Sequence, residues 1–380
     1  MISTRAFVPF ELEYYQSQFE HTVEYNLADS SVKCVTTQEW LDRDEIDALL
    51  NTGLFYPEVN GTRQLRERIA ALYPHVGPEQ VLVTVGASQA NSMVCNTLFQ
   101  PHDEVVVMSP GYRQVWGLAH NAGCIVKELP LDPECNWRLD LPALDELVTE
   151  RTKLVAIVNP NNPTGTILTR EEMQRVVAAC ARVGAWLHAD EVYRGTERNQ
   201  EEETPTFWGM YDKLICTNSL SKAYGLSGLR IGWAVAHADV IEALWRRHEY
   251  AVIAAAAPSM TLATIALQPE KRRALLDRQK QLARNGWQVL EAWLAEQRGL
   301  FDVQPSEATS IAFVRYHLPL SSFDFAERVR KEASVLLAPG SFMGAEQHLR
   351  ITLGYEPEKV RTALERLGAV AQRLNRLRNG

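Results

Sequence analysis

The sequence predicts an α/β fold in which helices sandwich a mostly parallel sheet and a smaller α+β domain follows. Between about residues 80 and 236, short β-rich runs alternate with helical segments, the order that builds a parallel sheet. After residue 265 this alternation stops and one long amphipathic segment begins. The 380 residues also exceed what a single hydrophobic core usually holds, so a second domain is expected.

The strands of the predicted sheet are runs of β-branched and apolar residues. They are expected at 81–85, 104–108, 153–158, 185–189, 213–217 and 231–236. Between them, segments 87–99, 112–122 and 170–183 carry apolar residues every three or four positions, as helices that cover a sheet do. Ligands of such sheets bind beyond the carboxyl ends of the strands, so the candidate site residues are sought there.

The remainder of the chain predicts an arm and a second domain. Residues 275–297 have the pattern of one long helix, followed by short strands near 310–316 and 335–338 and a closing helix from 356. The first forty residues do not fit the alternating pattern. The predicted division is an N-terminal arm at 1–45 that packs with the small domain, a large domain at 46–265 and a small domain at 266–380.

Composition narrows the class of function. A net charge of -8 and a pI near 5.7 give no electrostatic footprint for nucleic acid, so a small-molecule substrate is favoured. Six cysteines without a CxxC pair and nine histidines without HExxH predict neither a metal site nor a disulfide framework. Neither a signal peptide nor a membrane-spanning run is seen, so a cytoplasmic location is expected.

Lys222 is the first candidate catalytic residue. It follows the predicted strand at 213–217, in Ser219-Leu-Ser-Lys222-Ala-Tyr-Gly-Leu-Ser-Gly-Leu-Arg230. Small residues surround this lysine, and Arg230 lies eight positions later, so a Schiff-base amine stands beside a candidate anion site. A solvated loop lysine is the alternative interpretation.

Two further strand ends carry polar groups. Asp190 and Tyr193 follow the strand at 185–189, where a carboxylate can hold a pyridinium proton and a phenol can reach a ring oxygen. A helix N-cap is the alternative for Asp190. The turn Asn159-Pro-Asn-Asn162-Pro163-Thr-Gly165 follows the strand at 153–158, and a cis Asn162–Pro163 bond would hold the Asn162 amide toward a ligand.

A candidate phosphate site lies between the strand at 81–85 and the next helix. The small residues of Val85-Gly86-Ala87-Ser88-Gln89-Ala90 would let a phosphate approach free N–H groups at the helix N-terminus. An ordinary N-cap at Ser88 is the alternative interpretation.

Together, these four motifs resemble the fold type I pyridoxal phosphate enzymes, specifically the class I and II aminotransferase family, over roughly residues 50–355. The resemblance implies a seven-stranded type of sheet and pyridoxal 5′-phosphate as cofactor. It implies that Lys222 binds the cofactor aldehyde, that Asp190 pairs with the pyridine nitrogen, and that Tyr193 and Asn162 contact the phenolic oxygen.

Further residues are matched through the same resemblance. Tyr112, in Ser-Pro-Gly-Tyr112, matches the ring-stacking aromatic residue, and the phosphate cup is matched by Ser88, Gln89, Ser219 and Arg230. Tyr56 matches a tyrosine that reaches the neighbouring subunit's phosphate, which implies a homodimer with shared active sites. Arg350, in His348-Leu-Arg350-Ile-Thr-Leu-Gly354, matches the arginine that binds a substrate carboxylate, with an exposed edge-strand arginine as the alternative.

The predicted activity is transamination of a free amino acid, with Lys222 as the Cα base. Elimination, oxidation and cyclisation stay open because relatives with this apparatus perform them. The 219–230 motif and Tyr25-Asn-Leu-Ala-Asp29-Ser-Ser31 also resemble enzymes near capreomycidine synthase, which cyclise hydroxylated arginine. Acids such as Glu11, Glu13 or Asp29 would then hold a guanidinium. A noncatalytic regulatory domain is a distant alternative, because only about forty residues precede the fold.

Overall fold

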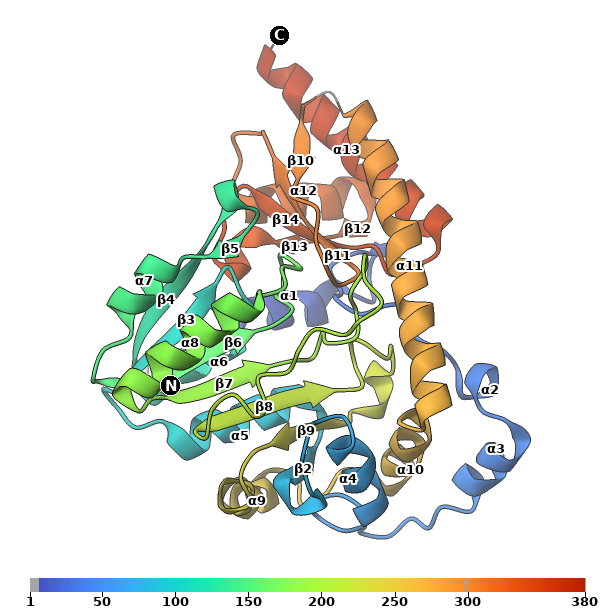
Figure 1. Cartoon of the computed structure of the whole chain (residues 1–380). Coiled ribbons are helices and arrows are strands. Elements are labelled where there is room, and N and C mark those ends of the chain that lie inside the picture. Colours follow the sequence, from blue (N-terminus) through green and yellow to red (C-terminus); the bar gives the residue numbers. More distant parts are fainter. Residues whose placement is uncertain (1–6, 298, 380) are drawn as a thin grey trace, which may run out of the picture.

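An eight-stranded sheet forms the centre of the large α/β unit in this computed structural model, which describes residues 7–297 and 299–379 (Figure 1). Its strand order is β2-β9-β8-β7-β6-β3-β4-β5. The five strands from β8 to β4 in this order are mutually parallel, whereas β9 is antiparallel to both neighbours and β5 to β4. The strands are β2 (Val81–Thr84), β3 (Glu104–Ser109), β4 (Ile125–Asp132), β5 (Arg138–Leu139), β6 (Thr152–Val158), β7 (Trp186–Asp190), β8 (Leu214–Ser219) and β9 (Gly232–Val235).

The prediction of a mostly parallel α/β sheet is confirmed, and each of the six expected strands is present within two residues of its predicted ends. Two strands were not expected. β4 is half exposed near the end of the sheet, so it lacks the continuous apolar run that identifies a buried strand. The two-residue β5 makes the sheet eight-stranded, one more than the seven-stranded type that the resemblance implied.

Helices cover both faces of this sheet. One face packs against α5 (Gly86–Leu98), α6 (Gln114–Ala122) and α9 (Ala238–Ala251), and the other against α4 (Arg63–Ala70), α7 (Leu141–Leu147), α8 (Arg170–Val183) and α10 (Ala257–Ala266). Local sequence fixes the ends of α8. At its start, the Thr169 hydroxyl accepts from the Glu172 amide, and the Glu172 carboxylate accepts from the Thr169 amide. At its end, Gly184 follows with φ +70°.

A smaller α+β unit lies at the other end of the long helix α11 (Pro269–Glu296), which runs along the height of the molecule in Figure 1. Its antiparallel sheet has the order β10-β11-β14-β13. The elements are β10 (Phe301–Val303), β11 (Ile311–Tyr316), α12 (Ser322–Ala333), β12 (Val335–Leu336), β13 (Ala338–Pro339), β14 (His348–Thr352) and α13 (Pro357–Asn379). Their apolar faces form a separate hydrophobic core with the C-terminal half of α11.

The N-terminal segment connects to both units. The helix α1 (Glu11–Phe19) packs on β13, and β1 (Tyr25–Asn26) pairs in parallel with β12. The helices α2 (Thr37–Trp40) and α3 (Arg43–Leu50) follow, and α3 packs on α10 of the large unit. Contacts of α1 and β1 with the small unit agree with an arm, and the domain boundaries at 45 and 265 stay a prediction.

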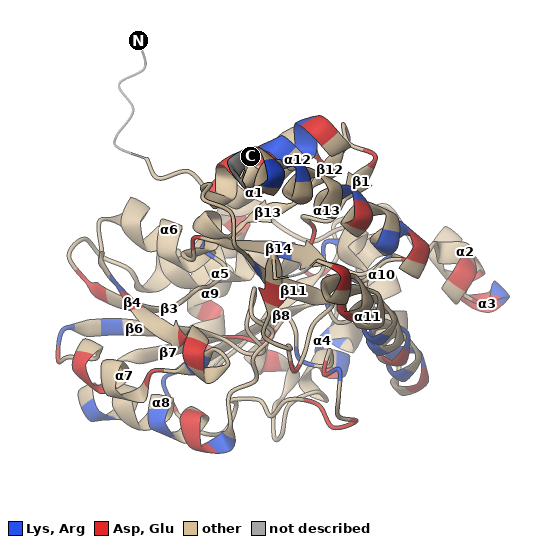
Figure 2. Ribbon diagram, turned by 90° about the horizontal axis from the view of Figure 1, so that it is seen from above, with Lys and Arg blue, Asp and Glu red and all other residues tan. Residues whose placement is uncertain are grey.

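Charged residues lie mostly on the outer layers of the fold. Figure 2 shows acidic and basic residues interspersed along the outer helices, while the strands of the main sheet carry few charges. None of the helices in residues 7–297 and 299–379 combines the length and the apolarity needed to cross a membrane. Within the same residues, no group of three or more histidine, cysteine or acidic side chains is placed to hold a metal ion.

Candidate active site

A cavity of about 450 Å³ lies at the carboxyl ends of β6, β7 and β8. The last residue of each of these three strands, Val158, Asp190 and Ser219, lines it. Side chains from α1, from the segment after β1 and from the start of α5 close its other sides. A cavity with a largely polar lining therefore lies where ligands of parallel sheets bind.

Lys222 lies on the wall of this cavity. Its Nζ donates to the hydroxyl oxygens of Ser30 and Ser31, at 2.9 and 3.3 Å. Because these partners are neutral, the amine is held in place without a carboxylate in direct contact. The alternative of a solvated loop lysine does not describe this environment.

Asp190 is buried, with 5% of its surface exposed, and faces the same cavity. Its Oδ2 accepts from Asn91 Nδ2 at 2.9 Å and its Oδ1 from the Val192 amide at 3.2 Å. Burial raises the pKa of Asp190 to about 6, against the lowering effects of those two bonds and of Lys222. No helix lies between β7 and β8, both within the described residues, so the helix N-cap interpretation of Asp190 is wrong. The carboxylate accepts from the Val192 amide within a turn and also lines the cavity.

Tyr193 and Asn162 both reach the cavity from neighbouring strand ends. Tyr193 is 2% exposed, and its hydroxyl has no hydrogen-bond partner among the described residues. A buried phenol without a partner is costly, so it points to a ligand atom at this position. Asn162 follows β6, precedes a cis Asn162–Pro163 bond as the sequence suggested, and accepts from Arg350.

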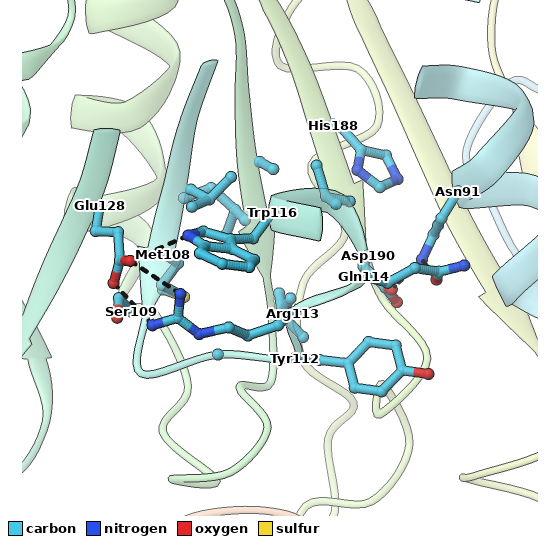
Figure 3. Close-up of a pocket in the computed structure, with 16 residues that line it drawn as sticks. Asn91, Met108, Ser109, Tyr112, Arg113, Gln114, Trp116, Glu128, His188 and Asp190 are labelled. Carbon is cyan, nitrogen blue, oxygen red and sulfur yellow. Dashed lines mark hydrogen bonds and ion pairs between the residues drawn. The ribbon is translucent and has the colours of Figure 1, made fainter. Parts of the chain in front are cut away.

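Tyr112 lies against the cavity from the loop before α6. Its hydroxyl donates to Glu13 Oε1 at 2.9 Å, which ties this ring to α1. Next to it, a smaller cavity of about 20 Å³ is closed by an Arg113–Glu128 ion pair, to which Trp116 Nε1 also donates (Figure 3). This pair stabilises the loop that carries the Tyr112 ring.

One end of the cavity is suited to an anion. Ala87 and Ser88, in the first turn of α5, line it together with Ser219 and Arg230. Arg230 has no ion-pair partner within the part of the chain that the structure describes. Gly86 has φ +76°, and a Cβ there would lie 2.5 Å from Arg230 Nη2, so the guanidinium needs a glycine at this helix start.

The N-cap of α5 is Val85, so Ser88 is inside the first turn and the simple N-cap interpretation of Ser88 is wrong. Gln89 does not line the cavity. Its Oε1 accepts from the Val85 amide at 2.6 Å, and its Nε2 has no described partner. The role of Gln89 in a phosphate cup stays a prediction.

Arg350 is 1% exposed and lies on β14, between β11 and β13. It is therefore not the exposed edge-strand arginine of the alternative interpretation. Its Nη1 donates to Asn162 Oδ1 at 3.1 Å and its Nη2 to the Ala28 carbonyl at 2.5 Å, while Nε has no described partner. The bond to Asn162 places the guanidinium directly behind the cavity wall.

Three acidic residues that line the cavity form what we call its acidic side. Glu13 lies on α1, Glu20 directly follows that helix and Asp29 lies in the segment after β1, whereas Glu11 is not part of the wall. Burial acts to raise the pKa of Asp29, but Lys222, the Ser30 and Ser31 amides and Arg350 hold it below its ordinary value. Asp29 is thus anionic at neutral pH.

Tyr56, like Gln89 and Arg350, is not among the residues that line the cavity. It is 78% exposed, in the segment between α3 and α4. Within a single chain it cannot contact the site, and any role requires a second subunit.

Asn91 was not predicted from the sequence, although it contacts Asp190 and lines both cavities. In the sequence it is one polar residue on the buried side of a helix. Its partner lies 99 positions away, so neither its burial nor its contact is visible in a local pattern.

Comparisons with known proteins agree with this geometry. Residues 25–367 match the family of class I and II aminotransferases. The arginine–pyruvate transaminase of Pseudomonas aeruginosa is 29% identical over 340 residues, 87% of this chain and 85% of that protein. Capreomycidine synthase of Streptomyces vinaceus is 31% identical over 297 residues, 77% of this chain and 74% of that protein. A pyridoxal phosphate-dependent aminotransferase from Streptococcus suis has a TM-score of 0.90 at 30% identity, covering 97% of this chain and 99% of that one.

The fold and the site define a fold type I pyridoxal phosphate-dependent enzyme. The chain belongs to the class I and II aminotransferase family, whose members use pyridoxal 5′-phosphate. The residues present fit this cofactor: an amine for the aldehyde, a buried carboxylate for the pyridine nitrogen, an unpartnered phenol, and an uncompensated arginine at a helix N-terminus for the phosphate.

Proposed function

We propose that this enzyme transfers the amino group of a free amino acid, leaving the corresponding 2-oxo acid. The observation that carries the proposal is that Lys222 and Asp190 line one cavity together with Arg230 and the start of α5. A phosphorylated pyridine aldehyde placed between these groups would have a counter-group for each of its functional atoms.

The proposed roles follow from the positions of the side chains. When bound, the cofactor acts as an electron sink that makes the substrate Cα–H acidic. Asp190 would keep the pyridine nitrogen protonated, and Tyr193 and Asn162 would donate to the phenolic oxygen. Lys222 Nζ would take the proton from the substrate Cα, because this amine lines the same cavity as Asp190.

Substrate binding is assigned to Asn162 in the cavity wall and to Arg350 directly behind it. Arg350 is buried and its Nε has no hydrogen-bond partner among the described residues, and planar guanidinium groups bind carboxylates through paired hydrogen bonds. We therefore assign the substrate α-carboxylate to Arg350, with the Asn162 amide beside it.

The experiment that tests transamination is a single-turnover reaction of the purified holoenzyme with a panel of amino acids and no added keto acid. We expect the cofactor absorbance to convert to that of the amine form, with release of one equivalent of 2-oxo acid. Continued turnover without that conversion, or a dehydrated or cyclic product, would exclude transamination as the main activity.

A second candidate function is supported by one specific observation, the acidic side of the cavity. Glu13, Glu20 and Asp29 line it together with Lys222, and carboxylates bind guanidinium groups by paired, charge-assisted hydrogen bonds. A relative named capreomycidine synthase is 31% identical. The second candidate is therefore elimination and ring closure on a hydroxylated, arginine-like amino acid.

Including arginine and its hydroxylated forms in the panel separates the two candidates by their products. A role of the acidic side in either reaction also requires selectivity for cationic side chains. We expect the variant Asp29→Asn to raise KM for arginine more than KM for an uncharged amino acid. An equal change in KM for both amino acids would show that Asp29 does not recognise the substrate side chain.

The proposed oligomer is a homodimer with shared active sites. Three apolar residues before Tyr56 are largely exposed, like the tyrosine itself. The exposed fractions are 76% for Leu50, 91% for Leu54, 67% for Phe55 and 78% for Tyr56. A run of exposed apolar side chains is typical of an interface. Light scattering is expected to give twice the chain mass of 42.8 kDa. A fully active protein of monomer mass would contradict the proposal.

Replacing Tyr193 with phenylalanine is expected to weaken turnover without abolishing it. The substitution keeps the ring and removes only the hydroxyl that has no described protein partner, so packing should be preserved. Loss of one charge-assisted hydrogen bond corresponds to about a tenfold to hundredfold fall in kcat. Steady-state kinetics with Tyr211→Phe as a matched control would check this. Tyr211 is only partly buried, and its hydroxyl donates to the carbonyl oxygen of Ala185, just before β7 and at the opposite end of that strand from Asp190.

A further inference from the structure

A chain of hydrogen bonds leads from the main sheet to the Asp190 carboxylate. His188 Nε2 lies 3.0 Å from Thr217 Oγ1, Thr217 Oγ1 donates to Asn91 Oδ1 at 2.8 Å, and Asn91 Nδ2 donates to Asp190 Oδ2 at 2.9 Å. Figure 3 shows Asn91 extending from its helix toward Asp190. The members come from β7, β8 and α5, so three separate elements meet at this point.

The chemistry of the groups gives the chain a single direction. An ionised Asp190 only accepts hydrogen bonds, so Asn91 must present its NH₂ group to it. The Asn91 carbonyl then faces Thr217, whose hydroxyl proton is used in donating to it. Thr217 can therefore only accept from His188, which requires the proton of that ring to be on Nε2.

All four residues are buried: His188 is 1% exposed, and Asn91, Thr217 and Asp190 are exposed by 5% or less. Burial lowers the pKa of His188 to about 4, so the ring is neutral and serves as a fixed donor. The second Asn91 contact, from Nδ2 to Gln114 Oε1 at 3.2 Å, further limits rotation of the amide. In such surroundings the orientation of Asn91 is determined by its partners.

We propose that Asn91 is a positioning residue that orients the Asp190 carboxylate toward the pyridine nitrogen, and that Thr217 and His188 fix the Asn91 amide for this task. This inference rests on the proposed role of Asp190. Apart from Asn91, Asp190 is approached by the Val192 amide and by the charge of Lys222, with Tyr112 and Tyr193 on the cavity side. Of these groups, only Asn91 binds the Oδ2 atom.

The first test requires no cofactor. In the cofactor-free protein with ¹⁵N-labelled histidine, ring nitrogen shifts distinguish a protonated nitrogen from a bare one, and a His188→Gln variant assigns the signals. We expect a neutral His188 with its proton on Nε2. In Asn91→Leu, Thr217 is free to donate to His188, so a mixture of the two ring forms is expected. A proton on Nδ1 in the unmodified protein would overturn the directed chain.

The second test uses the holoenzyme and the variant Asn91→Leu, whose side chain has the same branched arrangement of heavy atoms but makes no hydrogen bonds. We expect kcat to fall about tenfold to a hundredfold, as for loss of a bond to a charged group, with little change in KM. The visible absorption of the bound cofactor should shift, because the carboxylate beside its ring nitrogen is no longer oriented. Asn96→Leu, at an exposed position of the same helix, is the matched control.

Thr217 variants keep the proposal testable if Asn91→Leu does not fold. Thr217→Val removes only the hydroxyl, and we expect a smaller fall in kcat with the same direction of spectral shift. Thr217→Ser restores the hydroxyl and should restore both values. If Thr217→Val matches the unmodified enzyme in kcat and spectrum, the chain plays no role beyond packing. If the unmodified protein does not bind pyridoxal phosphate, the proposed function fails, while the cofactor-free test of the chain still stands.

Discussion

Replacing Lys222 with alanine is expected to abolish turnover, with a fall in kcat of at least about a thousandfold, because the amine is both the cofactor's point of attachment and the proposed Cα base. Among the described residues the side chain bonds only Ser30 and Ser31, so its removal should leave the fold intact. Absorption spectroscopy and kinetics measure the two losses separately.

Lys213→Ala is the matched control for this prediction. Lys213 lies just before β8, is exposed and donates to the Gly184 carbonyl at 2.9 Å. It should keep both the absorption of the attached cofactor and full turnover. If Lys222→Ala retained the absorption of a lysine-bound cofactor, another lysine would be the attachment site and the assignment of Lys222 would fail.

The large domain could be predicted from sequence because its strands are buried on both faces. Runs such as Val81–Thr84 are buried throughout and mostly apolar. They are separated by amphipathic helices with clear ends, as Thr169 and Gly184 show for α8. β4 lacked this signal because only Leu129 and Leu131 of its eight residues are buried. The two-residue β5 carries too few residues to form any pattern.

The cofactor side of the site was predicted for a similar reason. Lys222, Asp190 and Asn162 follow strands that end at one edge of the sheet, so their proximity follows from topology. Contacts made by other elements could not be predicted. The bond from Glu13 to Tyr112 and that from Asn91 to Asp190 each join residues 99 positions apart, and both depend on how a helix packs against the sheet.

Asp190→Asn is expected to lower kcat by about a hundredfold to a thousandfold, as does removal of a preorganised electrostatic group. The amide has the shape of the carboxylate, but its single oxygen can keep only one of the two hydrogen bonds that the carboxylate accepts from Asn91 and the Val192 amide. It also cannot keep a pyridine nitrogen protonated. Asp212→Asn, at an exposed position before β8, is the control and should have full activity. Comparable kcat values for the Asp190 and Asp212 variants would contradict the role of Asp190.

The same substitution should stabilise the cofactor-free protein, by an amount that depends on pH. The ordinary pKa of an aspartate is 3.8, whereas burial raises that of Asp190 to about 6 in the folded chain. Below pH 3.8 both states hold the proton, so the carboxyl group makes no pH-dependent contribution. Between these two values the unfolded chain releases its proton while the folded chain keeps it, so the unmodified protein loses stability as pH rises. Above about pH 6 the loss is complete and amounts to about 3 kcal/mol.

Asp190→Asn removes this titration. Its free energy of unfolding, measured by urea denaturation without cofactor, should therefore exceed that of the unmodified protein increasingly from pH 4 to 6, with a constant difference at higher pH. Bound cofactor should reduce the difference, because a protonated ring nitrogen beside Asp190 offsets the cost of the buried charge. A difference that is independent of pH would show that folding does not raise the pKa of Asp190. If Asp190→Asn stabilises the protein as much with cofactor bound as without it, Asp190 does not pair with the ring nitrogen.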